Sequence, residues 1–227
     1  FGLAGLPDPR LRVFSEGAFQ EENDDWGVSL ASNAFGIADT TQRVGAFSLP
    51  IGSKDSALVL PLPAGPHTAH VTAADGRGGV VLVEVYETPA GDQNARLVNL
   101  STRGQVGVGA NALFAGVVVG GTGKSRLLIR AVGPGLTQFG VSGVLARPTM
   151  ALFDGARQLL RTNTGWTTQT GTYDLIAAAR VAGAFALGAT SADSALIVTV
   201  DPGVYTVQVS GVGDTTGEAL VEIYKLP

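Results

Sequence analysis

Side chains suited to nucleophilic, acid–base or metal chemistry are sparse in this chain of 227 residues. It has no cysteine, which excludes thiolate nucleophiles, thiolate metal sites and disulfides together. Its two histidines, His67 and His70, stand three apart, and residues three apart on a strand point to opposite faces of a sheet. We therefore expect neither a histidine metal site nor an enzyme activity.

The densest group of potential metal ligands lies between Ser15 and Trp26 and includes Glu22, Asp24 and Asp25. Calcium takes about six to eight oxygen ligands from a flexible loop, so these carboxylates form a candidate calcium site. A solvated acidic edge is the alternative, because charges on the edge of a sheet discourage stray strand pairing. We favour that alternative and expect no cofactor, with calcium as the one candidate that these residues suit.

Trp26 and Trp166 are the only tryptophans and the candidate ligand-binding residues. An exposed indole can stack on a sugar ring, which would make each of them part of a glycan platform. Packing inside the fold is the commoner fate of a lone tryptophan, and we favour it.

The sequence GGTGKS at 120–125 resembles a phosphate-binding loop because it follows an apolar run. The full motif needs a glycine five positions before Gly123, where Val118 stands, and a helix after it. Residues 126–132 have instead the character of a strand. The glycines therefore predict a tight hairpin turn rather than a nucleotide site.

A long internal repeat organises the chain. SKDSAL at 53–58 returns as SADSAL at 191–196, and VLVEVYETP at 81–89 returns as ALVEIYKLP at 219–227. Repeats of this kind predict tandem units. We expect two, residues 1–90 and 91–227, in which 139–227 repeats 1–89 and 91–138 has no earlier copy. The start within a unit predicts a natural N-terminus further upstream.

Short apolar or alternating runs bounded by Gly, Pro, Asn and Asp predict eight strands in the second unit, as in a sandwich. They cover 96–101, 112–119, 125–132, 149–153, 158–162, 195–200, 204–210 and 219–224. Residues 174–186 and their counterpart 37–47 predict one short helix per unit, the later one capped by Asp174. The polar run Pro89–Asn94 predicts a brief linker. The expected fold is all-β: two tandem sandwiches of jelly-roll or immunoglobulin-like type, the first lacking its leading strands.

Composition narrows the classes of partner. Hydrophobic residues make up 45% of the chain and the mean hydropathy is +0.26, which suits packed cores rather than disorder. Every apolar run is broken early, so we expect no membrane span. A net charge of -4 without a Lys/Arg cluster disfavours nucleic acid. The absence of cysteine favours export.

The order of sequence blocks in residues 95–227 resembles a repeat found in long secreted bacterial surface proteins. The blocks are RLVNLSTRGQVGVG, LLIRAVGPGLTQFGV, RPTMALFDG, AGAFAL, SADSALIVTV and DPGVYTVQVSGVGDTTGEALVEIY. The closing part is also similar to bacterial pre-peptidase C-terminal domains, which are small β-sandwiches. The resemblance implies an extracellular or cell-surface, non-catalytic sandwich in a tandem array, and it carries over no defined ligand residues.

Two functions remain open. The first is a structural repeat of an extracellular fibre, sheath or surface protein that associates with itself or with neighbouring repeats. Its incomplete unit would take strands from the segment Arg96–Gln138 of the same chain or of a neighbour, and addition from a neighbour would give head-to-tail growth. Truncation of a longer protein would explain the same gap. The second is a carbohydrate- or surface-ligand-binding module that uses loops at the sandwich ends.

Overall fold

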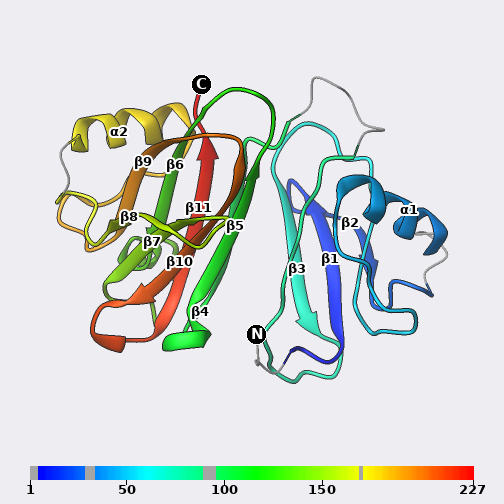
Figure 1. Ribbon diagram of the computed structural model, residues 1–227. Coiled ribbons are helices and arrows are strands. Elements are labelled where there is room, and N and C mark those ends of the chain that lie inside the picture. Colours follow the sequence, from blue (N-terminus) through cyan, green and yellow to red (C-terminus); the bar gives the residue numbers. More distant parts are fainter. Residues whose placement is uncertain (1–4, 29–33, 89–95, 169–170) are drawn as a thin grey trace. The chain divides into compact units, whose positions relative to one another are not determined.

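The chain is mostly β, with three antiparallel sheets and short helices (Figure 1). This computed structural model describes residues 5–28, 34–88, 96–168 and 171–227. The predicted linker Pro89–Asn94 lies outside these ranges. The chain divides into two compact units, Phe1–Leu97 and Val98–Pro227. The all-β prediction is confirmed.

The second unit contains two four-stranded antiparallel sheets, with the strand orders β5-β10-β7-β8 and β4-β11-β6-β9. Their strands are β4 (Asn99–Val106), β5 (Leu113–Val119), β6 (Ser125–Val132), β7 (Pro148–Asp154), β8 (Leu159–Asn163), β9 (Ser194–Val200), β10 (Gly203–Gly211) and β11 (Gly217–Lys225). All but β4 lie within two residues of the predicted ranges. β4 begins three residues later than predicted, at Asn99.

One hydrophobic core joins the two sheets. In β10, Tyr205, Val207 and Val209 are buried while the residues between them are only partly covered, as the alternating sequence predicts. In β6, both faces are buried: Leu127, Ile129 and Ala131 belong to the core between the sheets, whereas Leu128 packs on the opposite face. β6 therefore has a continuous apolar sequence rather than an alternating one.

The outer face of the β6 sheet is covered by α2 (Thr172–Val181), which packs Leu175 and Ala178 against Leu128 and Trp166. The helix confirms the prediction of a short alanine-rich segment, but its N-cap is Gly171, so the predicted capping role of Asp174 is wrong; Asp174 lies in the first turn. Within the described ranges, no helix combines the length and the apolar character needed to cross a membrane.

The predicted hairpin at GGTGK is wrong. β5 and β6, which flank this loop, belong to different sheets, so the loop carries the chain from one sheet to the other. Lys124 ends the loop and forms an exposed ion pair with Asp201, at 2.7 Å between Nζ and Oδ1. The glycines of the local sequence mark a turn correctly, but they do not indicate that β5 and β6 pair with other strands instead of with each other.

The first unit repeats part of this architecture. Its elements are β1 (Pro9–Ser15), β2 (Ala18–Asn23), α1 (Ala34–Val44) and β3 (His67–Ala73), with the sheet order β2-β1-β3. This order matches β8-β7-β10 of the second unit. The repeat extends to single hydrogen bonds: the Trp26 amide donates to the Asp55 carbonyl at 2.8 Å, and the Trp166 amide donates to the Asp193 carbonyl at 2.7 Å.

Among the described residues of the first unit, the second sheet has no counterpart. Residues 56–62 and 80–87 correspond to β9 and β11, yet they form no strand apart from an isolated bridge between Gly5 and Val80. In the second unit β9 and β11 pair with opposite sides of β6. Residues 5–28 and 34–88 contain no earlier copy of β6, so these two segments lack the strand that would join them.

The missing sheet predicts that the first unit is the less stable one, because it buries less apolar surface. Trp166→Phe leaves Trp26 as the sole fluorescent reporter of the first unit, and Trp26→Phe leaves Trp166 as the reporter of the second. In urea titrations we expect the Trp26 signal to change at a lower concentration than the Trp166 signal. Coincident transitions in the two variants would contradict this prediction.

Candidate functional site

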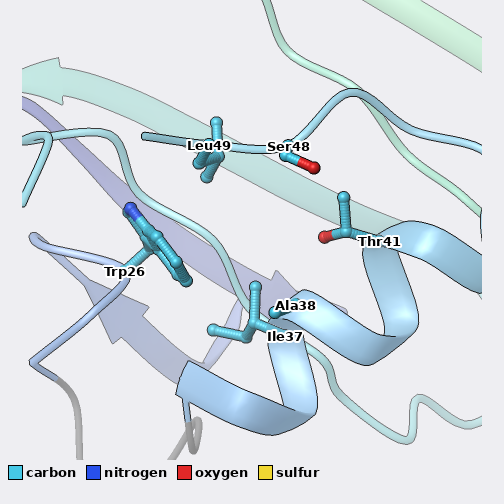
Figure 2. A pocket seen from close by; sticks show the side chains of 6 residues that line it. All are labelled: Trp26, Ile37, Ala38, Thr41, Ser48 and Leu49. Carbon is cyan, nitrogen blue, oxygen red and sulfur yellow. The ribbon is translucent and has the colours of Figure 1, made fainter. Parts of the chain in front are cut away.

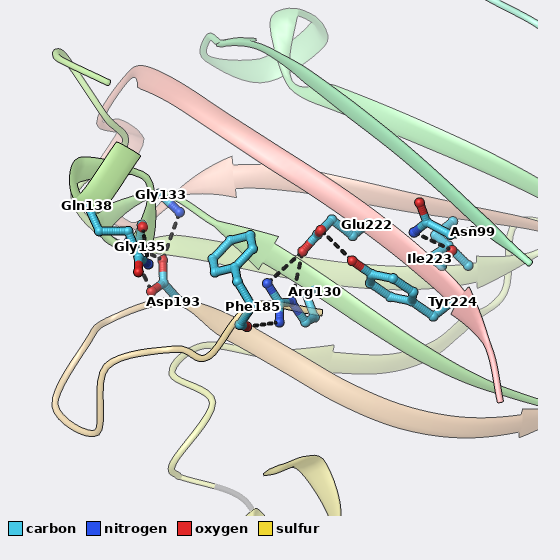
Figure 3. A network of polar contacts seen from close by, with 10 residues as sticks. All are labelled: Asn99, Arg130, Gly133, Gly135, Gln138, Phe185, Asp193, Glu222, Ile223 and Tyr224. Carbon is cyan, nitrogen blue, oxygen red and sulfur yellow. Dashed lines mark hydrogen bonds and ion pairs between the residues drawn. The ribbon is translucent and has the colours of Figure 1, made fainter. Parts of the chain in front are cut away.

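A buried polar network fixes β6 in the second unit (Figure 3). Arg130, in the middle of β6, is 1% exposed and lies directly opposite Glu222 of β11. Its Nε donates to Glu222 Oε2 at 2.8 Å, and its Nη2 lies 2.8 Å from the same oxygen. A buried charge is tolerated only where it is paired and hydrogen-bonded, so each side chain requires the other.

Two aromatic residues complete this arginine site. Arg130 Nη1 donates to the carbonyl of Phe185 at 2.6 Å, and the Phe185 ring centre lies 4.3 Å from the guanidinium carbon. The Tyr224 hydroxyl donates to the second oxygen of Glu222, Oε1, at 2.6 Å. Burial, and then the hydrogen bond to Glu222, raise the pKa of the Tyr224 hydroxyl well above its ordinary value. The hydroxyl therefore stays protonated and remains a donor.

Asp193 holds the turn that follows β6. Its side chain is fully buried, and its carboxylate accepts hydrogen bonds from the amides of Gly133, at 2.8 Å, and Gly135, at 3.1 Å. A Cβ on Gly133 would lie 2.0 Å from the carbonyl oxygen of Leu145, and one on Gly135 would lie 2.9 Å from the Asp193 carboxylate. Asp193 thus binds a distant backbone segment instead of forming a local turn. Gly135 is needed for the close approach to this carboxylate, and Gly133 is needed for the close approach to Leu145.

The network anchors a strand. Arg130 lies between β11 on one side and β9 on the other, and its side chain is covered by Phe185. With only 1% of Arg130 exposed, there is no room beside its guanidinium for a substrate. The Arg130 guanidinium therefore holds β6 against its neighbours in the fold.

The three predicted calcium ligands each have a separate cation partner. The pairs are Glu22 with Arg12 at 2.7 Å, Asp25 with Lys54 at 2.9 Å, and Asp24 with Arg10 at 3.7 Å. The hydrogen bond from Arg12 lowers the pKa of Glu22 below its usual range. Among the described residues no three histidine, aspartate or glutamate side chains gather as a metal site, so this geometry gives the calcium prediction no support.

Both predicted ligand-binding tryptophans are buried, with Trp26 7% and Trp166 5% exposed. The indole N–H of Trp26 donates to the carbonyl of Pro50, and that of Trp166 donates to the carbonyl of Gly188, both at 3.2 Å. Trp26 borders a cavity of about 30 Å³ beside α1, lined also by Ile37 and Leu49 (Figure 2). That space holds about one water molecule. The geometry favours packing, and neither indole offers a face for a sugar ring.

A larger pocket, of about 320 Å³, lies between α2 and the end of the chain in the second unit, beside Val181 and Leu226. Its volume reaches the lower end of small-molecule sites. The two charged side chains that line it, Arg126 and Asp174, are both exposed. No buried polar group orients a ligand there.

The first unit retains the acceptors of the network at equivalent positions. Glu84 and Tyr86 correspond to Glu222 and Tyr224, and the Tyr86 hydroxyl donates to Glu84 Oε1 at 3.1 Å. Asp55 corresponds to Asp193. Neither these acids nor Arg130 are among the site residues that the sequence predicts. The available signal was one arginine inside the apolar run LLIRAV together with a glutamate present in both copies.

Comparison of the chain with protein-family models, with curated proteins and with solved structures found no match. The similarity to secreted bacterial repeats therefore rests on the residues quoted above.

Removing one member of the Arg130–Glu222 pair leaves the other charge buried and unpaired. We expect Arg130→Met or Glu222→Gln to lower the free energy of unfolding of the second unit by about 3–5 kcal/mol. The double variant should lose less than the sum of the two. Urea titration followed by Trp166 fluorescence measures this, with Lys124→Met in the exposed pair with Asp201 as the control, expected to cost at most about 1 kcal/mol. Additive losses would show that the two side chains do not depend on each other.

Alkaline pH tests the Tyr224 hydrogen bond. The pKa of the Tyr224 hydroxyl in the folded protein lies above the unfolded value of about 10. The contribution of this hydroxyl to stability is therefore complete below about pH 10 and is lost as the pH rises towards the folded pKa. We expect the free energy of unfolding of the second unit to fall above about pH 10, with a smaller fall in Tyr224→Phe. Tyr173→Phe on the exposed face of α2 is the control. Equal slopes in Tyr224→Phe and the unchanged protein would contradict the assignment.

Proposed function

We propose that this protein is a non-catalytic structural repeat of an extracellular fibre, sheath or cell-surface protein. In this proposal each unit is a β-sandwich, and an incomplete sandwich is completed by strands added from a neighbour. The supporting observation is the pair of apolar segments, 56–62 and 80–87, that lie without partner strands in the first unit.

The exposed apolar side chains of the segment 80–87 support this proposal. Val83 is 46% exposed whereas its counterpart Val221 is 1% exposed, and Val85 is 51% exposed whereas Ile223 is 4% exposed. Burying apolar surface contributes about 25 cal/mol per Å². Adding the missing strands would cover these side chains, so the first unit has a favourable free energy available for association.

The unpaired backbone supports it as well. Within the described ranges, residues 57–62 and 81–87 form no hydrogen bond to another backbone group. The free edge of β3 corresponds to the edge of β10 that β5 occupies. Unpaired strand edges are sites where another chain adds a strand. Three strands equivalent to β4, β5 and β6 would complete the first unit.

The resemblance of residues 95–227 to secreted bacterial repeats supports the extracellular location, as does the absence of cysteine. A chain of units in which each gives strands to the next forms a head-to-tail contact that need not close, which suits a fibre or sheath.

Sedimentation at several protein concentrations, with electron microscopy of the same samples, tests the proposal. We expect concentration-dependent oligomers or ordered filaments. Val83→Lys places a charge on the apolar segment and should shift the distribution towards the monomer, because a charge on a strand edge opposes pairing. Ile51→Lys is the matched control, since Ile51 is 97% exposed and lies outside both segments. A monomer at every concentration, or equal effects of the two lysines, would contradict assembly by strand addition.

A further inference from the structure

We infer that the first unit contains a binding site for a strand with an arginine at one fixed position, followed by glycines three and five residues later. The pattern is that of residues 127–135, LLIRAVGPG. This inference rests on the proposed strand addition and identifies which strand is accepted at the centre of the missing sheet.

The register follows from the second unit. Arg130 lies opposite Glu222 of β11 and opposite Ala195 of β9. The corresponding residues of the first unit are Glu84 and Ala57. A strand that joins the segments 56–62 and 80–87 in the same register would place one residue between Glu84 and Ala57.

The side chains around that position form a site for a cation. Glu84 is exposed and accepts from Tyr86 as Glu222 accepts from Tyr224, and among the described residues no arginine or lysine pairs with it. Phe47 corresponds to Phe185, whose ring and carbonyl contact Arg130; Phe47 is 57% exposed. A carboxylate and an aromatic ring are thus present in the first unit without the guanidinium that they surround in the second.

The carboxylate of Asp55 explains why the accepted strand would carry glycines three and five residues after its arginine. Its counterpart Asp193 accepts from the amides three and five residues after Arg130. The Asp55 carboxylate accepts a hydrogen bond from the Ser53 hydroxyl at 2.7 Å. Its backbone carbonyl accepts from the Trp26 amide, as the Asp193 carbonyl accepts from the Trp166 amide. In the second unit a Cβ on Gly135 would meet the carboxylate itself and one on Gly133 would meet the carbonyl of Leu145, so both positions of the accepted strand require glycine for its two amides to reach Asp55 in the same way.

The second unit of another copy can donate this strand only by opening its own sheet. Each chain holds one segment with this pattern, and that segment is already the central strand of its own second unit, where Arg130 is 1% exposed. Donating this strand would open the β4-β11-β6-β9 sheet of one copy in order to complete the first unit of another. The preferred partner is therefore a strand of this pattern that is not already part of a complete unit, such as the leading part of a further repeat. A second copy of this chain is the weaker donor, which requires a high protein concentration.

A synthetic peptide covering Lys124–Gln138 serves as the probe, with the full chain as the receptor. We expect saturable binding by fluorescence anisotropy, and slower hydrogen exchange in residues 80–87 on binding. The Arg130→Met peptide should bind about tenfold more weakly or worse, as should the unchanged peptide to Glu84→Gln protein. The Met peptide and the Glu84→Gln protein together should lose little more than either change alone. Glu87→Gln, three residues along the same segment, and the Lys124→Met peptide are the matched controls.

The outcomes separate this inference from the proposed function. Equal binding of the Arg130→Met peptide overturns the arginine site but leaves strand addition standing, as does binding that changes exchange at 219–225 instead of 80–87. No binding of the unchanged peptide also overturns the inference, and sedimentation of the chain decides separately about assembly. Loss of binding confined to the Arg130 and Glu84 changes supports it.

Discussion

The backbone of a strand at the centre of a sheet needs a neighbour on each side, and in the second unit β6 meets that need for β9 and β11 together. Much of one half of the unit depends on this pairing. Leu128 of β6 gives α2 its packing surface, Arg130 neutralises Glu222, and the turn after β6 receives the Asp193 carboxylate. Removing β6 would leave two edges, two buried acids and one apolar face without partners.

The first unit shows what the same sequence does without that strand. Residues 80–87, VVLVEVYE, contain more β-branched residues than the ALVEIYK of β11, yet only β11 is a strand. Intrinsic β-propensity therefore does not decide the outcome; pairing does. Pro61, at the place of Thr199, removes one donor, but it lies near the end of what would be an edge strand, where proline is tolerated.

The parts of the structure that local sequence determines were predictable. Apolar periodicity located seven strands of the second unit closely, and the alanine-rich run located α2, because burial of one face sets those patterns. Whether GGTGK forms a hairpin depends on which sheet each flanking strand joins, which no local pattern contains. The role of Arg130 was missed for the same reason: a charge in an apolar run makes sense only once Glu222 stands opposite it. Trp26 and Trp166 occupy matching positions of the two copies, and each indole N–H donates to the carbonyl of an equivalent residue, Pro50 or Gly188, so the same local fold retains the same residue type.

A buried ion pair is a poor source of stability, because desolvation offsets most of its attraction. An apolar residue in place of Arg130 would cover the same surface, so the pair is better explained by register. Side chains alternate along a strand, and a slip of one residue would turn Arg130 from the Phe185 side into the core that holds Ile129. The arginine therefore admits β6 in one alignment only. Glu84 and Phe47 present the same requirement in the first unit, which is why we assign selectivity for the incoming strand to them rather than to the apolar residues around them.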